Sequence, residues 1–219
     1  MEVDHLFICV SPEAREAEVL RSFGLIEGSA NHHPGQGTAN RRFFFRNAYI
    51  ELLYLHDPTE ARSALTKATQ LYDRLTSKRK SISPFGIGFR PSTDADKQVP
   101  FPGWCYNPIY LPASSGIHIG NSSVSEPMWF FLSFGSRPDN LTLEKRQPMD
   151  HPSGFCEIAS LRVVIQTREE FSESAIMANR VEGVEIVRGK THLIQIGFDG
   201  ERKGRWHDFR PILPLVFRW

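Results

Sequence analysis

The fold is decided by VDHLFICV at residues 3–10 and by the SPE that follows at residues 11–13. Side chains along 3–10 alternate between two faces, and both faces carry apolar residues, which predicts a short and largely buried strand. A serine before proline, with an acid in the first turn, predicts that a helix begins here, and Gly24 marks its end. The chain therefore opens with a strand followed by a helix.

Three more strands complete this first unit. We expect a strand over 25–30, a Gly/Pro loop over 31–38, and a hairpin of 41–45 with 48–55. The order is β-α-β-β-β. Apolar residues at helical spacing then predict one long helix over 59–77.

The same order recurs faintly in the middle of the chain and more clearly at its end. Strands are expected at 85–90, 117–120 and 128–134, then at 157–166, 184–187, 193–198 and 214–219. Thr167 and Glu170 form a capping box that predicts a helix after the strand at 157–166. The repetition is topological and predicts an α+β protein of repeated β-α-β-β-β modules.

We divide the chain into three stretches that together form one compact domain. They are a first module with its connecting helix over 1–80, a degenerate second module over 81–150, and a C-terminal β-α-β unit over 151–219. A chain of 219 residues has room for such modules around a shared core.

Composition and charge exclude several classes of protein. The 26 basic and 25 acidic residues give a formal net charge of +1, so nothing in the overall charge attracts nucleic acid. No apolar run reaches the roughly 18 residues that span a bilayer. Residues 1–10 carry acids where a secretory signal carries basic residues, so we expect a cytoplasmic protein with no membrane partner.

Cysteines and glycines give no cofactor motif. Cys9, Cys105 and Cys156 are scattered, so we expect buried thiols and neither a disulfide framework nor a zinc ribbon. Gly86-Ile87-Gly88 lacks the third glycine and the following helix of a dinucleotide loop. No nucleotide cofactor is predicted.

Two polar residues stand in strands that ought to be apolar. Glu51 lies between Ile50 and Leu52, where burial is costly unless the carboxylate meets a cation, a metal or hydrogen-bond donors. His5 is the natural partner, because the first and last strands of the unit can share a sheet and face the same side. The alternative is structural: His5 is a satisfied core histidine, and Glu51 pairs with Arg41, Arg42 or Arg46 across the hairpin.

An imidazole and a carboxylate also form half of a mixed metal site suited to zinc, manganese, iron or nickel. His5 and Glu51 are thus the predicted, incomplete ligand set for one divalent metal ion, and the predicted catalytic pair. A third ligand would have to come from Gln195, His33, His118 or His151.

The Gly/Pro loop is a second candidate element. Its glycines let the backbone approach a ligand closely, and Arg41 could form a fork on an oxyanion. The predicted substrate-binding residues are His33, Gln36, Thr38, Asn40 and Arg41, together with Tyr49 on the Glu51 face. The alternative is a surface loop in which Thr38 and Asn40 make only turn hydrogen bonds.

Several of these segments resemble one family. Asp4-His5-Leu6, the loop from His33 to Arg41, Tyr49-Ile50-Glu51-Leu52 and His151-Pro152-Ser153-Gly154 are similar to the glyoxalase-like domains of the vicinal oxygen chelate superfamily. The resemblance implies paired modules whose curved mixed sheets form a cleft. It also implies that His5 and Glu51 occupy the metal-ligand positions of the first module.

The chain departs from this pattern in its other modules. Laying the terminal unit on the first puts Ser160 opposite His5 and Gln195 opposite Glu51. The middle unit offers only Gly86 or Ile87 and Trp129 or Phe130. A second His/Glu pair is therefore missing.

Three functions remain open. The first is an enzyme of lyase, isomerase or dioxygenase type, acting on a small molecule with a carbonyl or adjacent oxygens, with or without a metal. The second is a metal-free protein of the same fold that binds or sequesters a small molecule, which the missing second pair favours. The third is an interaction protein whose modules merely dimerise; a homodimer is compatible with all three.

Overall fold

The computed structural model describes residues 1–93 and 96–219, whose strands form two sheets. The first sheet has the order β2-β3-β4-β1-β5-β8-β7-β6 and the second β10-β9-β11-β13-β12. The strands of the first sheet are β1 (Glu2–Cys9), β2 (Asn31–His33), β3 (Thr38–Phe44), β4 (Tyr49–Leu55), β5 (Phe85–Arg90), β6 (Gly103–Tyr106), β7 (Ile117–Gly120) and β8 (Met128–Phe131). Those of the second are β9 (Ile158–Ile165), β10 (Val184–Arg188), β11 (Leu193–Phe198), β12 (Trp206–Asp208) and β13 (Leu215–Arg218).

Helices are few and short. The α-helices are α1 (Ala17–Phe23), α2 (Pro58–Ala61), α3 (Leu71–Thr76) and α4 (Glu173–Ala178), with single 3₁₀ turns at Pro12–Ala14, Lys67–Thr69, Pro138–Asn140, Leu143–Lys145 and Asp199–Glu201. No helix in the described part of the chain has the length and apolar character needed to cross a membrane.

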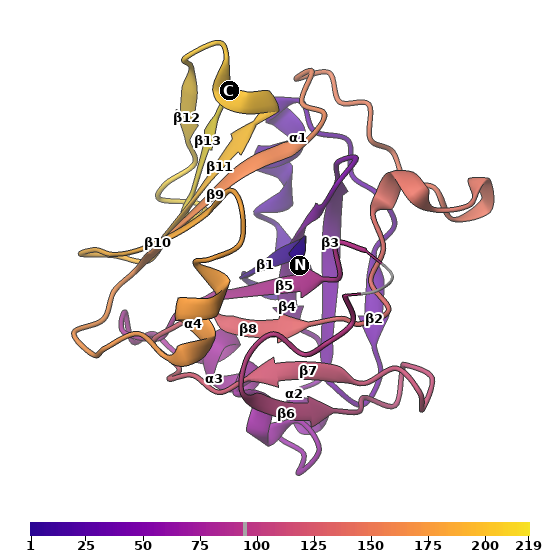
Figure 1. Cartoon of the computed structure of the whole chain (residues 1–219), viewed down its shortest axis with the longest axis vertical. Helices are drawn as coiled ribbons and strands as arrows, with labels where there is room; N and C mark the ends of the chain where they lie inside the picture. The colour runs from indigo at the N-terminus through magenta and orange to yellow at the C-terminus, as the bar shows by residue number, and fades with distance from the viewer. Residues whose placement is uncertain (94–95) are drawn as a thin grey trace.

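The first sheet has two halves with matching order. β1 and β5 pair antiparallel at its centre, and each has a parallel neighbour on its other side, β4 for β1 and β8 for β5. The sheet curls strongly, so that β2 and β3 stand across from β6 and β7 (Figure 1). The predicted α+β class, with a curved mixed sheet forming a cleft, is confirmed.

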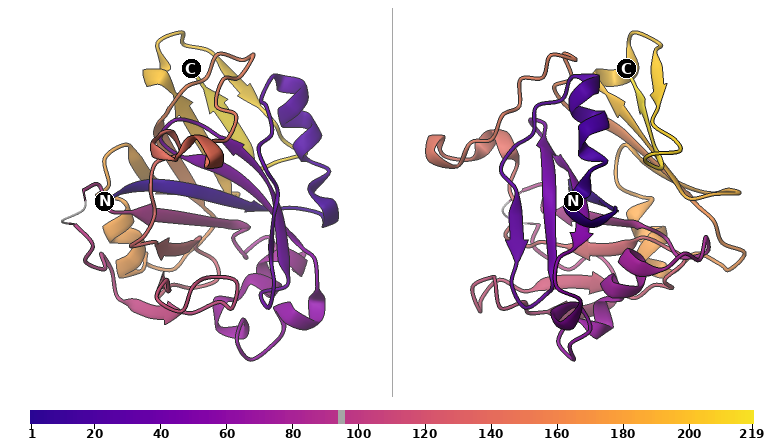
Figure 2. Two further views of the ribbon diagram at one scale, coloured as in Figure 1. Left: turned by 90° about the vertical axis from the view of Figure 1, so that its right-hand side faces the viewer. Right: turned by 180° about the vertical axis from the view of Figure 1, so that it is seen from behind.

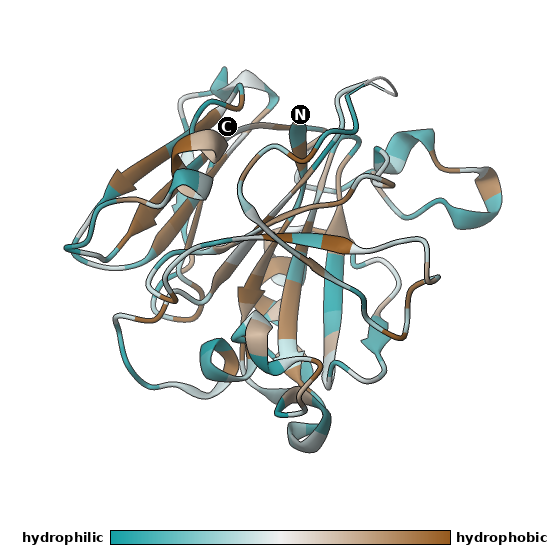
Figure 3. Cartoon of the chain, turned by 60° about the horizontal axis from the view of Figure 1, so that its bottom comes forward, coloured by the Kyte–Doolittle hydropathy of each residue, from teal (hydrophilic) through white to brown (hydrophobic). Residues whose placement is uncertain are grey.

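The two faces of the first sheet serve different purposes. On β1, Leu6 and Ile8 face the main core, which continues into the second sheet through residues such as Leu161 and Ile196. His5 and Phe7 face the opposite, concave side, where Phe7 joins a smaller apolar cluster. Apolar segments follow the central strands, and the connecting loops are mostly hydrophilic (Figure 3).

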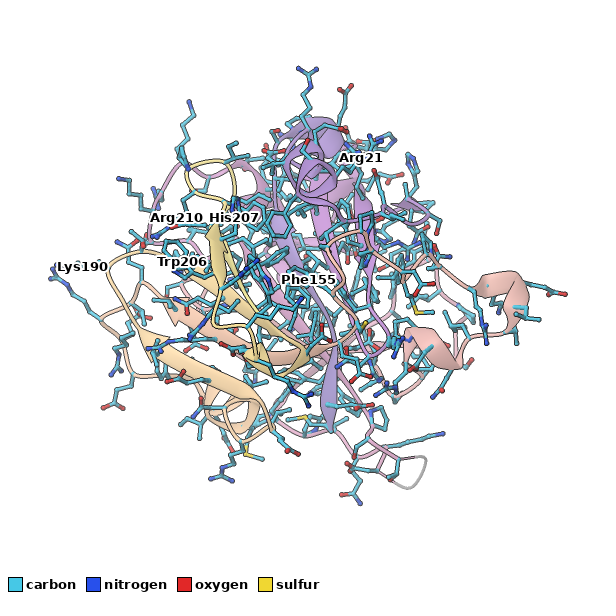
Figure 4. All side chains as sticks on the ribbon, turned by 90° about the horizontal axis from the view of Figure 1, so that it is seen from above. Arg21, Phe155, Lys190, Trp206, His207 and Arg210 are labelled. Carbon is cyan, nitrogen blue, oxygen red and sulfur yellow. The ribbon has the colours of Figure 1, made fainter. Side chains whose placement is uncertain are left out.

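The second sheet closes the convex side together with α1 (Figure 2). Phe23 at the end of α1 lies among aromatic rings, with its ring centroid 5.3 Å from that of Phe209 and 4.8 Å from that of His207. Phe155 lies inside this contact, whereas Lys190 lies at an outer tip (Figure 4). Apolar burial of this kind is the main force that holds the two sheets together.

The predicted helices are only partly correct. Gly24, at a φ of 105°, ends α1 as expected, but Glu13 also takes a positive φ, so the helix begins only at Ala17. The long helix predicted over 59–77 is wrong. The Thr66 and Thr69 hydroxyls bond backbone carbonyls and Gln70 adopts a left-handed conformation, which leaves two short helices.

Other local corrections have similar causes. No strand forms over 25–30, because the carbonyl and side chain of Ser29 are held by the Arg42 guanidinium, and β2 starts at Asn31 instead. Thr167 does not cap the last helix. Ser172, fixed by the Glu126 carboxylate, does so. Cys105 is exposed, so its interpretation as a buried thiol is wrong.

The superposition of the C-terminal unit on the first also needs correction. β4 runs parallel to β1, whereas β11 runs antiparallel to β9; the parallel neighbour of β9 is β10. Gln195 on β11 is therefore not the counterpart of Glu51.

Candidate functional site

A cavity of about 180 Å³ lies on the concave face of the first sheet. One wall is polar and comes from β1, β3, β4 and the loop before β3; it carries His5, His33, Gln36, Asn40 and Glu51. The other wall is apolar and comes mainly from β7, β8 and α3, with Leu71, Ile117, Met128 and Phe130. Such a mixture of apolar surface and a few convergent polar groups is typical of small-molecule sites.

His5 lies between two carboxylates. Its Nδ1 is 2.6 Å from Asp4 Oδ1, and its Nε2 is 3.5 Å from Glu51 Oε2. Because a carboxylate oxygen accepts, Nδ1 carries the proton in the bond to Asp4. That bond fixes the ring and directs Nε2 toward Glu51.

Glu51 is buried, with 5% of its surface exposed, and is oriented by an amide. Asn40 Nδ2 donates to Glu51 Oε1 over 2.7 Å, and Asn40 Oδ1 accepts from the backbone of Asn31. The alternative in which Arg41, Arg42 or Arg46 pairs with Glu51 is wrong, because the partners of its carboxylate among the described residues are Asn40 and His5. Strand alternation brings Glu51 and His5 together as expected.

Aromatic rings hold the imidazole in place. Tyr49 stacks on His5 with ring centroids 4.3 Å apart and planes 11° apart, and Phe130 contacts it edge-on. Burial, followed by the charges of Asp4 and Glu51, raises the pKa of Tyr49 well above its ordinary value. Tyr49 is therefore a neutral wall of the cavity at physiological pH.

The loop before β3 forms the cavity rim. His33 Nδ1 lies 2.9 Å from Thr38 Oγ1, which also accepts from Gln36 Nε2 over 2.8 Å. Tyr110, from the segment after β6, donates to Gln36 Oε1 over 3.1 Å and so connects that segment to the loop. Burial lowers the pKa of His33, which keeps its imidazole neutral.

Neighbouring arginines on β3 face opposite sides of the sheet. Arg41 donates to both oxygens of Glu27, and also to Glu18 and the Ala14 carbonyl, on the convex side. Arg42 instead lines the cavity and bonds only the carbonyl and hydroxyl of Ser29 among the described residues. The structure thus brings His5, His33, Gln36, Asn40, Tyr49 and Glu51 to the cavity, holds Thr38 just behind it, and leaves Arg41 outside.

The donor atoms around His5 and Glu51 form only part of a metal site. His5 Nε2 and Glu51 Oε2 are close enough to share one ion, and the Asp4 bond to Nδ1 is the outer support that metal-bound histidines usually have. Catalytic metal sites use about three protein ligands, however. Within residues 1–93 and 96–219 no group of three His, Cys, Asp or Glu side chains is placed to hold an ion.

The proposed third ligands lie mostly elsewhere. His118 Nε2 contacts the Phe101 carbonyl, and His151 bridges the backbones of Ile26 and Phe44. Gln195 lies in the second sheet. His33 alone shares the cavity with His5 and Glu51, so the donor set present does not complete a metal centre.

Three residues of the site were not predicted. Asp4 was missed because alternation along a regular strand points its side chain away from that of His5. The pairing of β1 with β5 is irregular between Val3 and His5, and this changes the direction of the Asp4 side chain. Tyr110 comes from a loop without any motif. Arg42 could have been found, because alternation places it with Asn40 and opposite Arg41.

The fold and the site define a class of protein: an α+β protein whose curled mixed sheet encloses a half-polar cavity around an Asp-His-Glu line. The glyoxalase-like domain family matches residues 3–92, and the resemblance noted in the sequence is confirmed over this segment.

Among solved structures, the chain is similar to the crystal structure of a hypothetical protein from Staphylococcus aureus, with a TM-score of 0.55 and 12% identity. The match covers 99% of this chain and 97% of that one, and at this identity it supports the fold alone. No curated protein matches the sequence.

Proposed function

We propose that the cavity binds a small molecule with a carbonyl or two adjacent oxygens, and that Glu51 and His5 move a proton on it in a reaction of isomerase or lyase type. The observation that carries the proposal is the line Asp4, His5, Glu51 at the cavity wall, with Nε2 and Oε2 3.5 Å apart. An imidazole nitrogen and a carboxylate oxygen that face each other across this gap can share one proton.

Each neighbour then has a role in the proton transfer. Glu51, held by Asn40, takes the proton from the carbon beside the ligand carbonyl. His5 stabilises the proton that Glu51 gains. Its Nε2 faces the Glu51 oxygen, because its Nδ1–H is fixed on Asp4. Both groups lie in a largely water-excluded wall, where electrostatic interactions are strong.

His33 supplies the electrophile in this proposal. The Thr38 hydroxyl, which already accepts from Gln36, donates to Nδ1 of the neutral His33 ring. Nε2–H then remains free to donate to the ligand carbonyl oxygen. A neutral imidazole donor paired with a carboxylate base is a suitable arrangement for forming an enolate.

The test is exchange of the protons beside a carbonyl. The protein is added to pyruvamide, pyruvate or dihydroxyacetone in D2O, and loss of the corresponding proton signals is followed by NMR. We expect at least one compound to exchange about 100-fold faster than without protein, because general base catalysis contributes effects of this size or more. Glu51→Gln and His5→Asn should abolish the effect, whereas Glu185→Gln, an exposed carboxylate of the second sheet, should not.

A second candidate, binding without chemistry, is favoured by the incomplete metal donor set. It predicts that probes bind and shift the His5 ring signals while no exchange is seen. Metal content by elemental analysis, on protein purified without chelator, tests the predicted divalent ion and with it dioxygenase-type chemistry. Stoichiometric metal that is lost in both His5→Asn and Glu51→Gln would support a metal ion held by these two residues. Metal retained in both variants would contradict such a site.

A further inference from the structure

Arg42 is a cation at the cavity, and no carboxylate of the described residues pairs with it. Its Nε donates to the Ser29 carbonyl over 2.8 Å and its Nη2 to the Ser29 hydroxyl over 2.9 Å. No other hydrogen bond and no ion pair of this guanidinium is found within residues 1–93 and 96–219. Nη1 is therefore left with its donors unused, although the side chain lines the cavity.

Arg41, the preceding residue, has a purely structural guanidinium and serves as a comparison for Arg42. It forms a fork on Glu27 and also pairs with Glu18, and these carboxylates raise its pKa above the ordinary value. Arg41 is thus paired with two carboxylates on the convex side, whereas Arg42 on the concave side is paired with none of the carboxylates in residues 1–93 and 96–219.

Glu51 does not neutralise Arg42 either, although the two residues are opposite each other on β3 and β4. One Glu51 oxygen accepts from Asn40 and the other faces His5, so the carboxylate is turned away from the guanidinium. The Arg42 guanidinium carbon instead lies over aromatic rings, 5.1 Å from the centroid of Phe44 and 6.0 Å from that of Tyr49.

These contacts hold the Arg42 guanidinium in place beside the cavity. Tyr49 connects it to the reacting end of the cavity, because the Tyr49 ring also stacks on His5. The Arg42 charge is also felt by Tyr49 and His33, where it acts alongside the larger effect of burial. A planar guanidinium with unused donors recognises oxyanions best, since it can bind two oxygens at once.

We infer that Arg42 is a specificity-determining residue and that the ligand of this cavity carries an oxyanion, a carboxylate or a phosphate, in addition to its carbonyl. The inference rests on the proposed function, because it assumes that the cavity takes a small carbonyl compound. The oxyanion binds at Arg42 and the carbonyl lies toward His5, His33 and Glu51.

The test compares charged and neutral probes of matched shape by NMR titration. Pyruvate is compared with pyruvamide for a carboxylate, and dihydroxyacetone phosphate with dihydroxyacetone for a phosphate. In the unchanged protein, at least one anion should bind about tenfold or more tightly than its neutral partner, as charge-assisted hydrogen bonds do. The pair that shows the larger ratio identifies the oxyanion.

Variants on the two sides of β3 give the control. Arg42→Gln should reduce the preference to near unity while neutral probes still bind, and Arg42→Lys should keep part of it. Arg41→Gln should leave the preference intact. Circular dichroism and thermal unfolding establish that each variant is folded.

The outcomes separate the two claims. Equal binding of both members of each pair in the unchanged protein, or a preference that survives in Arg42→Gln, overturns the inference and leaves the proposed function standing. Failure of every probe to bind contradicts the proposed function and the inference with it. A preference lost equally in Arg41→Gln also overturns the inference, because general surface charge then explains it.

Discussion

Asp4 and His5 are neighbours in sequence on one strand, yet Asp4 Oδ1 accepts a hydrogen bond of 2.6 Å from His5 Nδ1. Consecutive side chains of a regular strand point to opposite faces. The pairing of β1 with β5 shifts between Val3 and His5, and this irregularity turns the Asp4 carboxylate back toward the ring. The other Asp4 oxygen lies 3.4 Å from Nη1 of the buried Arg90.

Replacing Asp4 with asparagine should destabilise the protein. The charge of Arg90 would remain buried and His5 would lose its acceptor, so we expect the free energy of unfolding to fall by about 3 kcal/mol in urea denaturation. Glu13→Gln is the control, because the pair of Glu13 with Arg15 is exposed and should change stability by about 0.5 kcal/mol or less. A loss no larger than that of the control would contradict a supporting role for Asp4.

His151 should make stability depend on pH. Its Nε2 donates to the Phe44 carbonyl and its Nδ1 accepts from the Ile26 amide, which needs a neutral ring. Burial lowers its pKa from the ordinary 6.5. Below pH 6.5 the unfolded chain therefore binds a proton that the folded protein does not, and the free energy of unfolding falls as the pH falls toward the folded pKa.

Urea denaturation at a series of pH values from about 7.5 to 5 measures this effect. His151→Gln should reduce the slope below pH 6.5 without removing it, since burial also lowers the pKa of His33 and His192. A slope identical to that of the unchanged protein would show that His151 does not contribute.

Gly88 should not tolerate a side chain. A Cβ at this position would come within 2.4 Å of the Phe130 ring, which contacts His5 at the cavity. We expect Gly88→Ala to cost about 1–3 kcal/mol of stability by overpacking. Adding Phe130→Leu should recover part of the loss, and a double-mutant cycle measures the coupling; additive losses would mean that the two positions do not touch.

The cysteines should differ in reactivity. Cys105 is exposed, whereas burial, the largest influence, raises the pKa of Cys9 to about 12. Alkylation of the folded protein with iodoacetamide, followed by mass spectrometry, should label Cys105 first and Cys9 last, because the thiolate is the reactive form. Labelling of Cys9 as fast as Cys105 would contradict the raised pKa of the Cys9 thiol.

Much of the site was predictable because strand alternation is a local property of the backbone. Polar residues in apolar strands identified His5 and Glu51, and alternation placed them on one face. The same rule places Arg41 and Arg42 on opposite faces, although Arg41 was the one predicted to bind the ligand and Arg42 is the one that lines the cavity. Helices were less predictable, since side-chain hydroxyls such as that of Thr66 compete with the helix for backbone groups.

By itself, the sequence determined that this chain builds two-faced strands, with an imidazole and a carboxylate on one face and the glyoxalase-like pattern around them. Only the tertiary structure decided that Asp4 turns back to His5, that Tyr110 joins the rim through Gln36, and that Phe130 stands across from His5 where a second ligand pair was sought. The physical reason is that alternation depends on neighbours along the chain, whereas a bulge, a loop closure and the opposing wall depend on how distant segments pair and pack.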